Sequence, residues 1–206
     1  MTRPQQYPGD RGTAEGSTSR DGASRACPAG AGGGEAPPDV RLVPMTPRMY
    51  HRYFREYEND PDLYIDRTAF SPYTYSEEKT ERYIRRQRDL DRVTLAVLHG
   101  DEIVGEIVLK NIEERRSATI GLCMKNDRCK NRGYGTQAER LAIAYVFEEL
   151  DIPVLYADAL VTNTRSRHVL EKVGFRFVRE EGDFAFYRID REAWRRRRDG
   201  TRTSGR

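Results

Sequence analysis

The sequence predicts a mixed α/β fold built on one central mixed sheet. One early segment and the segment after residue 134 place apolar residues at helical spacing, and a cap with acids in the first turn indicates a second early helix. Residues 92–124 and 153–161 instead contain the short apolar runs typical of strands. The expected order is β, α, α, β, β, β, α, β, α, β, β. One connection in this order is a helical crossover that makes two strands parallel, and the short connections favour antiparallel pairs. We therefore expect six to seven strands flanked by about four helices.

Composition divides the chain of 206 residues into a folded middle and two polar ends. Residues 1–38 are rich in Gly, Ala, Pro and Ser and contain no apolar run, so we expect them to be disordered. Residues 191–206 contain seven arginines and two acids, which predicts a disordered basic tail. The predicted domain is the segment between them, 39–190.

Most of the excess positive charge lies in the basic tail. The tail contributes +5 and residues 1–38 are neutral, so the net charge of +3 leaves −2 for residues 39–190. A nucleic-acid-binding domain is expected to be basic itself, so we predict no nucleic-acid binding by this domain, and its slight acidity favours a cationic or amine substrate. We also expect a cytoplasmic protein without a membrane anchor or metal site, because the sequence contains no long apolar segment and no CxxC pair.

The first helices follow from local signals. Residues 40–43 form a short apolar strand, and Thr46 and Pro47 then suit the N-cap and first position of a helix. Aromatic residues between 49 and 57 give that helix one aromatic face. Ser76 caps a second predicted helix that runs to about residue 88.

The later elements alternate more regularly. Three closely spaced strands are expected within 92–124 and should form an antiparallel meander. An amphipathic helix follows the next loop, and residues 153–161 are as continuously apolar as a buried central strand. A short helix ends at Gly174, and the segment 175–190 reads as a closing hairpin.

Glycines and cationic residues gather where the amphipathic helix begins. Gly133 and Gly135 allow close approach of the backbone to a ligand, Lys130 and Arg132 add positive charge, and Thr136 adds a hydroxyl. The start of a helix presents unpaired N–H groups and a partial positive charge. The segment therefore predicts a pyrophosphate site.

The same glycines fit a second interpretation. Residues 133–138 match the G-x-G-x-x-A dinucleotide fingerprint, and Asp158 lies about 20 residues further on. However, eight residues separate the preceding strand from the glycines, and only one parallel βαβ unit is expected. An NAD(P)-binding protein is thus the weaker alternative.

Two motifs together resemble the GNAT superfamily of acetyl-CoA-dependent N-acetyltransferases. The segment Lys130–Gly135 is similar to the family's [RQ]-x-x-G-x-[GA] motif, with lysine in place of the usual first residue. The segment 163–175, "NTRSRHVLEKVGF", is similar to the branch that includes ribosomal-protein N-terminal acetyltransferases. The motifs are about 30 residues apart, as in the family, and the resemblance extends over about 40–190.

The resemblance implies a GNAT-type fold whose sheet splays between the fourth and fifth strands. Acetyl-CoA would enter this gap, with the pantetheine arm paired to the fourth strand, where Gly121 would mark a bulge. The implied cofactor-binding residues are Leu122, Cys123, Met124, Lys130, Asn131, Arg132, Gly133, Tyr134, Gly135, Thr136 and Asn163.

The implied reaction is direct attack of a primary amine on the thioester within a ternary complex. Relatives often place a tyrosine where this chain has Leu170, so we expect Ser166 to protonate or hydrogen-bond the CoA sulfur, unless it serves only in the first turn of its helix. Glu106 is the first candidate for the general base, although it also suits a solvent-facing strand position, and Asp158 is the second.

The acceptor side is less well defined by the sequence. Tyr73 and Tyr75 are candidate residues for the acceptor pocket. The acceptor could be a small molecule or a protein N-terminus, and a homodimer is compatible with the chain. A non-catalytic acyl-CoA-binding module is the remaining alternative, because the expected tyrosine is missing.

Overall fold

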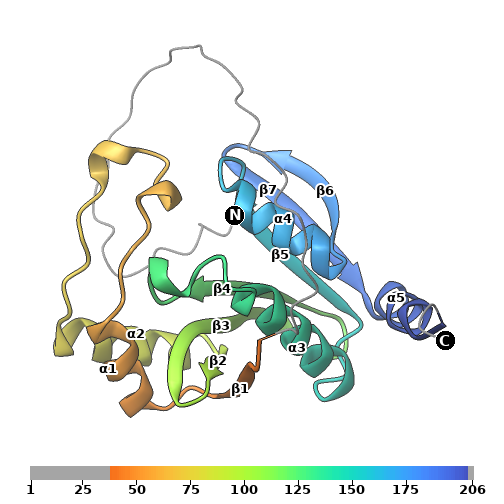
Figure 1. The fold of residues 1–206 in the computed structure, drawn as a ribbon, viewed down its shortest axis with the longest axis horizontal. Coiled ribbons are helices and arrows are strands. Elements are labelled where there is room, and N and C mark those ends of the chain that lie inside the picture. Colours follow the sequence, from red (N-terminus) through yellow and green to blue (C-terminus); the bar gives the residue numbers. More distant parts are fainter. Residues whose placement is uncertain (1–37, 204–206) are drawn as a thin grey trace, which may run out of the picture.

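The computed structural model describes residues 38–203, so the prediction of a disordered segment over 1–38 lies outside the described residues except for Pro38. One seven-stranded sheet runs through this part of the chain in the order β1-β2-β3-β4-β5-β7-β6 (Figure 1). Within it, β4 and β5 are parallel and all other neighbours are antiparallel. The prediction of a mixed α/β fold is confirmed.

The elements have the following bounds: β1 (Arg41–Pro44), α1 (Pro47–Arg55), η1 (Pro61–Leu63), η2 (Arg67–Ala69), α2 (Glu77–Asp89), β2 (Val93–His99), β3 (Glu102–Glu113), β4 (Ser117–Met124), η3 (Asp127–Cys129), α3 (Tyr134–Glu148), β5 (Val154–Leu160), α4 (Thr164–Val173), β6 (Arg176–Glu181), β7 (Phe184–Asp190) and α5 (Arg191–Thr203). No helix among these is long and apolar enough to cross a membrane.

Local capping explains where several helices begin and end. The Thr46 hydroxyl accepts a hydrogen bond from the Met49 N–H, and the Ser76 hydroxyl accepts one from the Lys79 N–H. Gly174 ends α4 with φ at +113°, a backbone conformation that favours glycine. The predicted boundaries at these positions agree with the structure.

The C-terminal segment differs from its prediction, because residues 191–203 form the helix α5 instead of a disordered tail. Trp194 packs against Phe147 of α3, with ring centroids 5.4 Å apart, and the Arg198 guanidinium lies 4.4 Å from the centre of the Trp194 ring. Burial of one large aromatic side chain thus holds a segment that its charge alone would leave in solvent.

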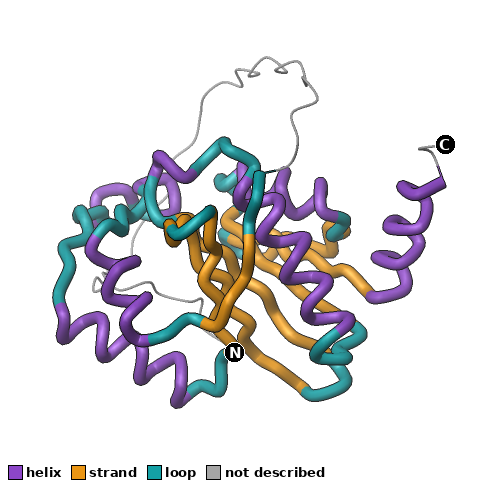
Figure 2. Tube along the Cα trace, turned by 60° about the horizontal axis from the view of Figure 1, so that its bottom comes forward, coloured by secondary structure: helices purple, strands orange, loops and turns teal. Residues whose placement is uncertain are grey.

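Helices cover both faces of the sheet (Figure 2). Neighbouring residues of a strand point to opposite faces: Ile107 of β3 belongs to the apolar cluster that α3 and α4 share with the sheet. Glu106, the preceding residue, meets tyrosines of α1 and α2 on the other face. The α1–α2 face has its own cluster, which is largely aromatic.

The parallel pair β4–β5 separates before either strand ends. Their pairing runs from Ser117 opposite Val154 to Ile120 opposite Ala157, whereas β4 continues to Met124 and β5 to Leu160. The two strands diverge from that point in Figure 1.

A bulge at Gly121 does not produce this separation. Gly121 pairs regularly with Val108 of β3, and the irregularity in that ladder lies between Lys110 and Glu113. The splay therefore belongs to the β4–β5 side of the strand alone.

Candidate active site

The free end of β4 directs two backbone positions into the gap beside β5. The Lys125 N–H donates to the Val104 carbonyl of β3 at 2.9 Å. Successive residues of a strand turn their backbone groups toward alternate neighbours, so those of Met124 and Leu122 face away from β3. Cys123 faces β3 instead. Of the three residues predicted to pair with pantetheine, only Leu122 and Met124 offer N–H and C=O groups to the gap.

The start of α3 lies against this end of β4. Gly133 is the N-cap with φ at +77°, and it provides no side-chain cap to the first amides of the helix. A Cβ atom at Gly135 would lie 3.2 Å from a methyl group of Leu122, so the helix backbone approaches β4 as closely as glycine permits. An uncapped helix start and a close backbone fit the diphosphate of a coenzyme.

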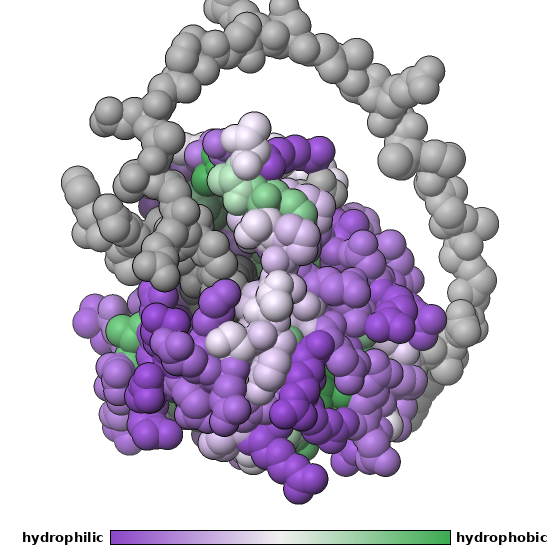
Figure 3. Space-filling model, turned by 90° about the vertical axis from the view of Figure 1, so that its left-hand side faces the viewer, coloured by the Kyte–Doolittle hydropathy of each residue, from purple (hydrophilic) through white to green (hydrophobic). Residues whose placement is uncertain are grey.

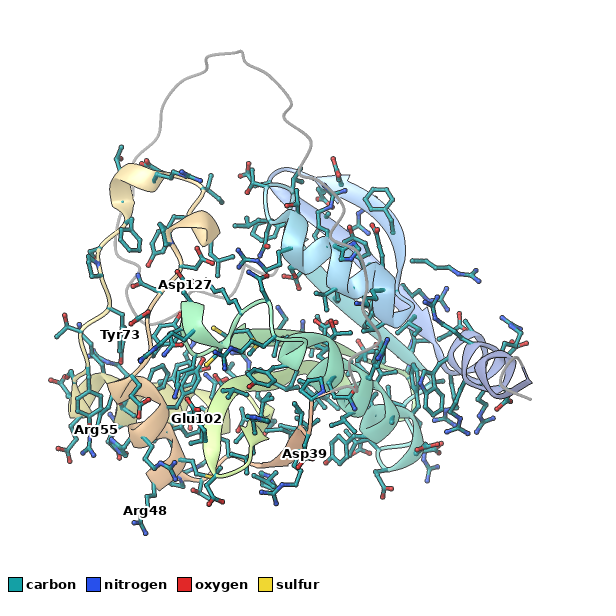
Figure 4. The ribbon with its side chains drawn as sticks, in the orientation of Figure 1. Asp39, Arg48, Arg55, Tyr73, Glu102 and Asp127 are labelled. Atoms are coloured by element: carbon teal, nitrogen blue, oxygen red, sulfur yellow. The ribbon has the colours of Figure 1, made fainter. Side chains whose placement is uncertain are left out.

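The loop before α3 is less cationic than its sequence indicates. The Lys130 ammonium forms ion pairs with Asp60 and Asp127, and the side chains of Lys130 and Asp60 are each only 12% exposed. Its charge is therefore compensated, while Asn131 and Arg132 remain exposed. Asp127 lies where β4 meets the long α1–α2 connection (Figure 4).

A cavity of about 540 Å³ opens next to the gap. Its walls come from the α1–α2 connection, the end of β5, the start of α4 and the β6–β7 turn. Its polar residues include Asp60, Tyr64, Arg67, Asn163, Arg165 and Asp183. The face in Figure 3 that includes the α1–α2 connection is largely hydrophilic, with a pale to hydrophobic band down its middle.

Asn163 and Ser166 meet at the start of α4. The Asn163 side-chain oxygen accepts a hydrogen bond from the Ser166 N–H at 3.1 Å and thereby caps the helix. The Asn163 side-chain NH₂ group is not used by this cap and remains a donor beside the cavity. Ser166 is half-buried in the first helical turn.

Glu106 is buried, and the interpretation of it as a solvent-facing residue is wrong. Its side chain is 1% exposed under α1 and α2. The Tyr50 hydroxyl donates to Oε1 and the Tyr83 hydroxyl donates to Oε2, each at 2.9 Å. Burial raises the pKa of Glu106 to about 7, while both tyrosine hydrogen bonds act in the opposite direction.

The neighbouring Cys123 thiol is also shielded. It pairs across the β3–β4 ladder with Glu106, and burial raises its pKa to about 11. It therefore suits a packing role better than a nucleophilic one.

The remaining candidates lie outside the cavity. Asp158 accepts a hydrogen bond from the Lys110 ammonium at 3.0 Å. Tyr73 packs between Phe54 and Tyr57 in the aromatic cluster. Asp158 is thus occupied by an ion pair and Tyr73 by aromatic packing.

Tyr75 is occupied by a different contact. Its hydroxyl is 2.9 Å from Nδ1 of His51, whose Nε2 is 2.9 Å from a carboxylate oxygen of Glu81. Neither Tyr73 nor Tyr75 lines the cavity.

Sequence reasoning overlooked the cavity residues of the α1–α2 connection. Asp60, Tyr64 and Arg67 lie between the first two helices, in a segment for which the sequence analysis predicts no function. The signal that could have revealed them is length, because long connections between elements of a compact domain are commonly functional. Within residues 38–203, no group of three or more His, Cys, Asp or Glu side chains could hold a metal ion.

Comparisons with known proteins agree with this arrangement. The family model described as "Acetyltransferase (GNAT) domain" matches residues 39–176. A Bacillus subtilis (strain 168) protein, YdaF, which bears the provisional name of ribosomal N-acetyltransferase, is 32% identical over 114 residues. That match covers 55% of this chain and 62% of the relative, so it spans less than two thirds of the relative's length.

Two solved structures share the fold at low sequence identity. An aminoglycoside acetyltransferase, AAC(6')-Ib, in complex with coenzyme A has a TM-score of 0.63 and 16% identity, covering 78% of this chain and 99% of that one. The Campylobacter jejuni N-acetyltransferase PseH in complex with acetyl coenzyme A has a TM-score of 0.52 and 21% identity, covering 74% and 99%. With its family model matching well over half of the sequence, this chain belongs to the GNAT acetyltransferase family.

Proposed function

We propose that this protein transfers an acetyl group from acetyl-CoA to a primary amine, by direct attack of the amine within a ternary complex. The observation that carries this proposal is the early separation of β4 from β5, which ends their pairing at Ile120 and Ala157. The separation leaves strand backbone free beside the uncapped start of α3 and next to a cavity. These features together suit a coenzyme on one side and an acceptor on the other.

The chain's own groups would hold the coenzyme mainly through the backbone. Leu122 and Met124 offer amide groups to the pantetheine arm, and the amides of residues 131–136 surround the diphosphate position. The Asn163 side-chain NH₂ can donate to a pantetheine carbonyl. Tyr134 is buried with its ring 4.7 Å from that of His99, which fixes the first turn of α3.

The amine must be neutral to attack, and free alkylamines have a pKa near 10. Glu106 is buried under two helices, and both of its oxygens accept hydrogen bonds from tyrosine hydroxyls. We therefore propose that water in the cavity takes the proton from the amine. The Met124 N–H faces the gap and is placed to stabilise charge on the carbonyl oxygen. As the new C–N bond forms and the C–S bond breaks, the Ser166 hydroxyl is the proposed hydrogen-bond donor to the departing sulfur.

Two observations bear on which kind of amine is the acceptor. The cavity is large enough for a small amine or the first residues of a peptide. The name of the Bacillus subtilis relative brings a protein N-terminus into consideration. A panel should therefore contain peptides with free N-termini, polyamines and aminoglycosides.

Thermal shift measurements with acetyl-CoA test the coenzyme site. We expect acetyl-CoA at about 100 times its Kd to stabilise the protein by about 2.7 kcal/mol. The double variant Gly133→Glu/Gly135→Glu should lose this shift, because two carboxylates would occupy the diphosphate position. Leu90→Glu/Val178→Glu, which adds the same charge at two exposed apolar positions, should retain it.

Thiol release and product masses from the amine panel test the reaction. Transfer to at least one amine supports the proposal. Tight acetyl-CoA binding without thiol release for any amine would identify a non-catalytic acyl-CoA-binding module. Normal acetyl-CoA binding by the double glycine variant would refute the assignment of the coenzyme site.

A further inference from the structure

A second hollow lies at the opposite end of β5 from the cavity. It has a volume of about 450 Å³ and forms where the start of β5, the end of β7 and the first turns of α5 meet. Four arginines line it: Arg188, Arg191, Arg195 and Arg196. We call this site the arginine hollow. Because β5 is seven residues long, about 20 Å of strand separates the arginine hollow from the cavity.

The acids of the arginine hollow are already engaged. Asp190 accepts a hydrogen bond from the Ala193 N–H at 2.8 Å and so caps α5. Glu192 forms an ion pair with Arg196 on the next helical turn. Within residues 38–203, Arg188 and Arg195 are exposed and form no ion pair with the protein. Four arginines thus face three acids, namely Asp190, Glu192 and the Asp151 that pairs with Arg191, which leaves a small excess of positive charge.

Arg191 also has unused donors. One of its nitrogens lies 2.7 Å from a carboxylate oxygen of Asp151. The other edge of the same guanidinium, Nε and Nη2, is buried and has no hydrogen-bond partner among the described residues. Buried donors without acceptors are costly. Because protein encloses both nitrogens, Arg191 adds its charge to the site, and we assign it no direct contact with an oxyanion.

An exposed aromatic ring continues the arginine hollow across the sheet. Tyr156 of β5 is 42% exposed and pairs directly with Arg188 of β7, which pairs in turn with Arg176 of β6. Directly paired residues share one face of a sheet, so these three side chains form a row. Leu155, the neighbour of Tyr156, is in the α3–α4 cluster, so the row lies on the opposite face.

We propose that the arginine hollow and Tyr156 form a binding surface for single-stranded RNA. The exposed arginines would contact successive phosphates, and a base would stack on the Tyr156 ring. An acidic peptide would use the arginines but not the exposed ring beside them. Three of the four arginines belong to the segment 191–206, whose charge of +5 is counted apart from the slightly negative residues 39–190.

Fluorescence anisotropy with a labelled single-stranded RNA of about 15 nucleotides tests the proposal, with the full chain at about 50 and about 200 mM salt. We expect affinity to fall by at least about 10-fold between these salt concentrations. Arg188→Glu/Arg195→Glu should weaken binding by at least about 10-fold and lower the salt slope by about 1.4, since each phosphate contact on a single strand contributes about 0.7. Tyr156→Ala should weaken binding by about 5-fold or more and leave the slope unchanged.

Matched controls separate this surface from general charge. Arg48→Glu/Arg140→Glu reverses the same charge on exposed residues of α1 and α3 and should bind RNA within about 3-fold of the unchanged protein. The acetyl-CoA thermal shift, expected in all variants, reports that they are folded. Three results would overturn the proposal: no RNA binding by the unchanged protein, equal losses in both double variants, or displacement of RNA by polyglutamate at equal charge.

Discussion

Glu106→Gln removes a buried carboxyl group whose protonation is linked to folding. The folded-state pKa of Glu106 is about 7, against an ordinary value of 4.5. Between these pH values the folded chain binds more protons than the unfolded chain, so the free energy of unfolding falls as the pH rises through this window. A shift of 2.5 pKa units corresponds to about 3 kcal/mol, lost by the time the pH reaches about 8. This conversion applies because the side chain is 1% exposed.

Urea unfolding of both proteins at pH values from about 5 to about 8 measures this effect. Glutamine has the same shape, can still pair with the hydroxyls of Tyr50 and Tyr83, and does not titrate. The difference in unfolding free energy between variant and unchanged protein should therefore shift by about 3 kcal/mol in favour of the variant as the pH rises. Glu114→Gln, at an exposed position in the β3–β4 turn, should show almost no such shift.

Two results would refute this reasoning. A difference that stays constant within about 0.5 kcal/mol across the pH range would show that Glu106 is ionised at little cost in the folded protein. A fall in kcat of about 100-fold or more in Glu106→Gln, with the acid limb of the pH profile lost, would show that Glu106 takes the proton of the amine directly. We expect kcat within about 10-fold, because the carboxyl group does not reach the cavity.

Substitutions at three further positions test separate parts of the structure. Asn163→Ala should cost about 1 kcal/mol of stability and weaken acetyl-CoA binding, whereas Asn163→Asp should retain the helix cap and lose only the binding, measured by urea unfolding and titration calorimetry. Gly105→Ala should destabilise the protein by about 1–3 kcal/mol in urea unfolding, because its Cβ would lie 2.8 Å from the Cys123 carbonyl oxygen. Trp194→Ala should cost about 2 kcal/mol and increase hydrogen exchange in α5 while that in α3 changes little.

The parts of the fold that could be predicted depend on contacts within a few residues. Thr46, Ser76 and Gly174 each cap a helix through groups on their own turn, so their residue types reveal the boundary. The glycine-rich start of α3 is local in the same way. Strand order followed because a helical crossover produced one parallel pair and short connections produced the others.

The parts that escaped prediction depend on partners far away in the chain. Glu106 is buried by tyrosines that are 56 and 23 residues away, so the residues around it on the strand do not reveal its burial. Lys130 is neutralised by Asp60, which is 70 residues away. The helix α5 is held by a ring contact with α3. In each case the environment of the charge, not the charge itself, determines its role.

One end of the α1–α2 connection attaches the cavity wall, the proposed acceptor side, to the loop proposed to bind the coenzyme. Glu58 N–H donates to the Lys125 carbonyl at 2.9 Å, and the Lys130–Asp60 ion pair follows two residues later. Farther along, the Asn59 side chain links the two ends of the connection to each other. The amide of Asn59 donates to the Tyr64 hydroxyl and to a backbone carbonyl, each at 2.8 Å, and accepts from a backbone N–H at 2.7 Å.

The α1–α2 connection, which forms this wall of the cavity, is therefore fixed at its start. The start of the connection is bonded to the residues that follow β4 and lead into α3, so the cavity wall and the loop proposed to bind the diphosphate form one connected structure. Farther along the connection, the Asn59 hydrogen bonds and a ring contact between Tyr64 and Phe70 hold residues that are largely exposed. If the proposed function holds, differences in acceptor size are met by this exposed part of the connection, and the loop before α3 keeps its place.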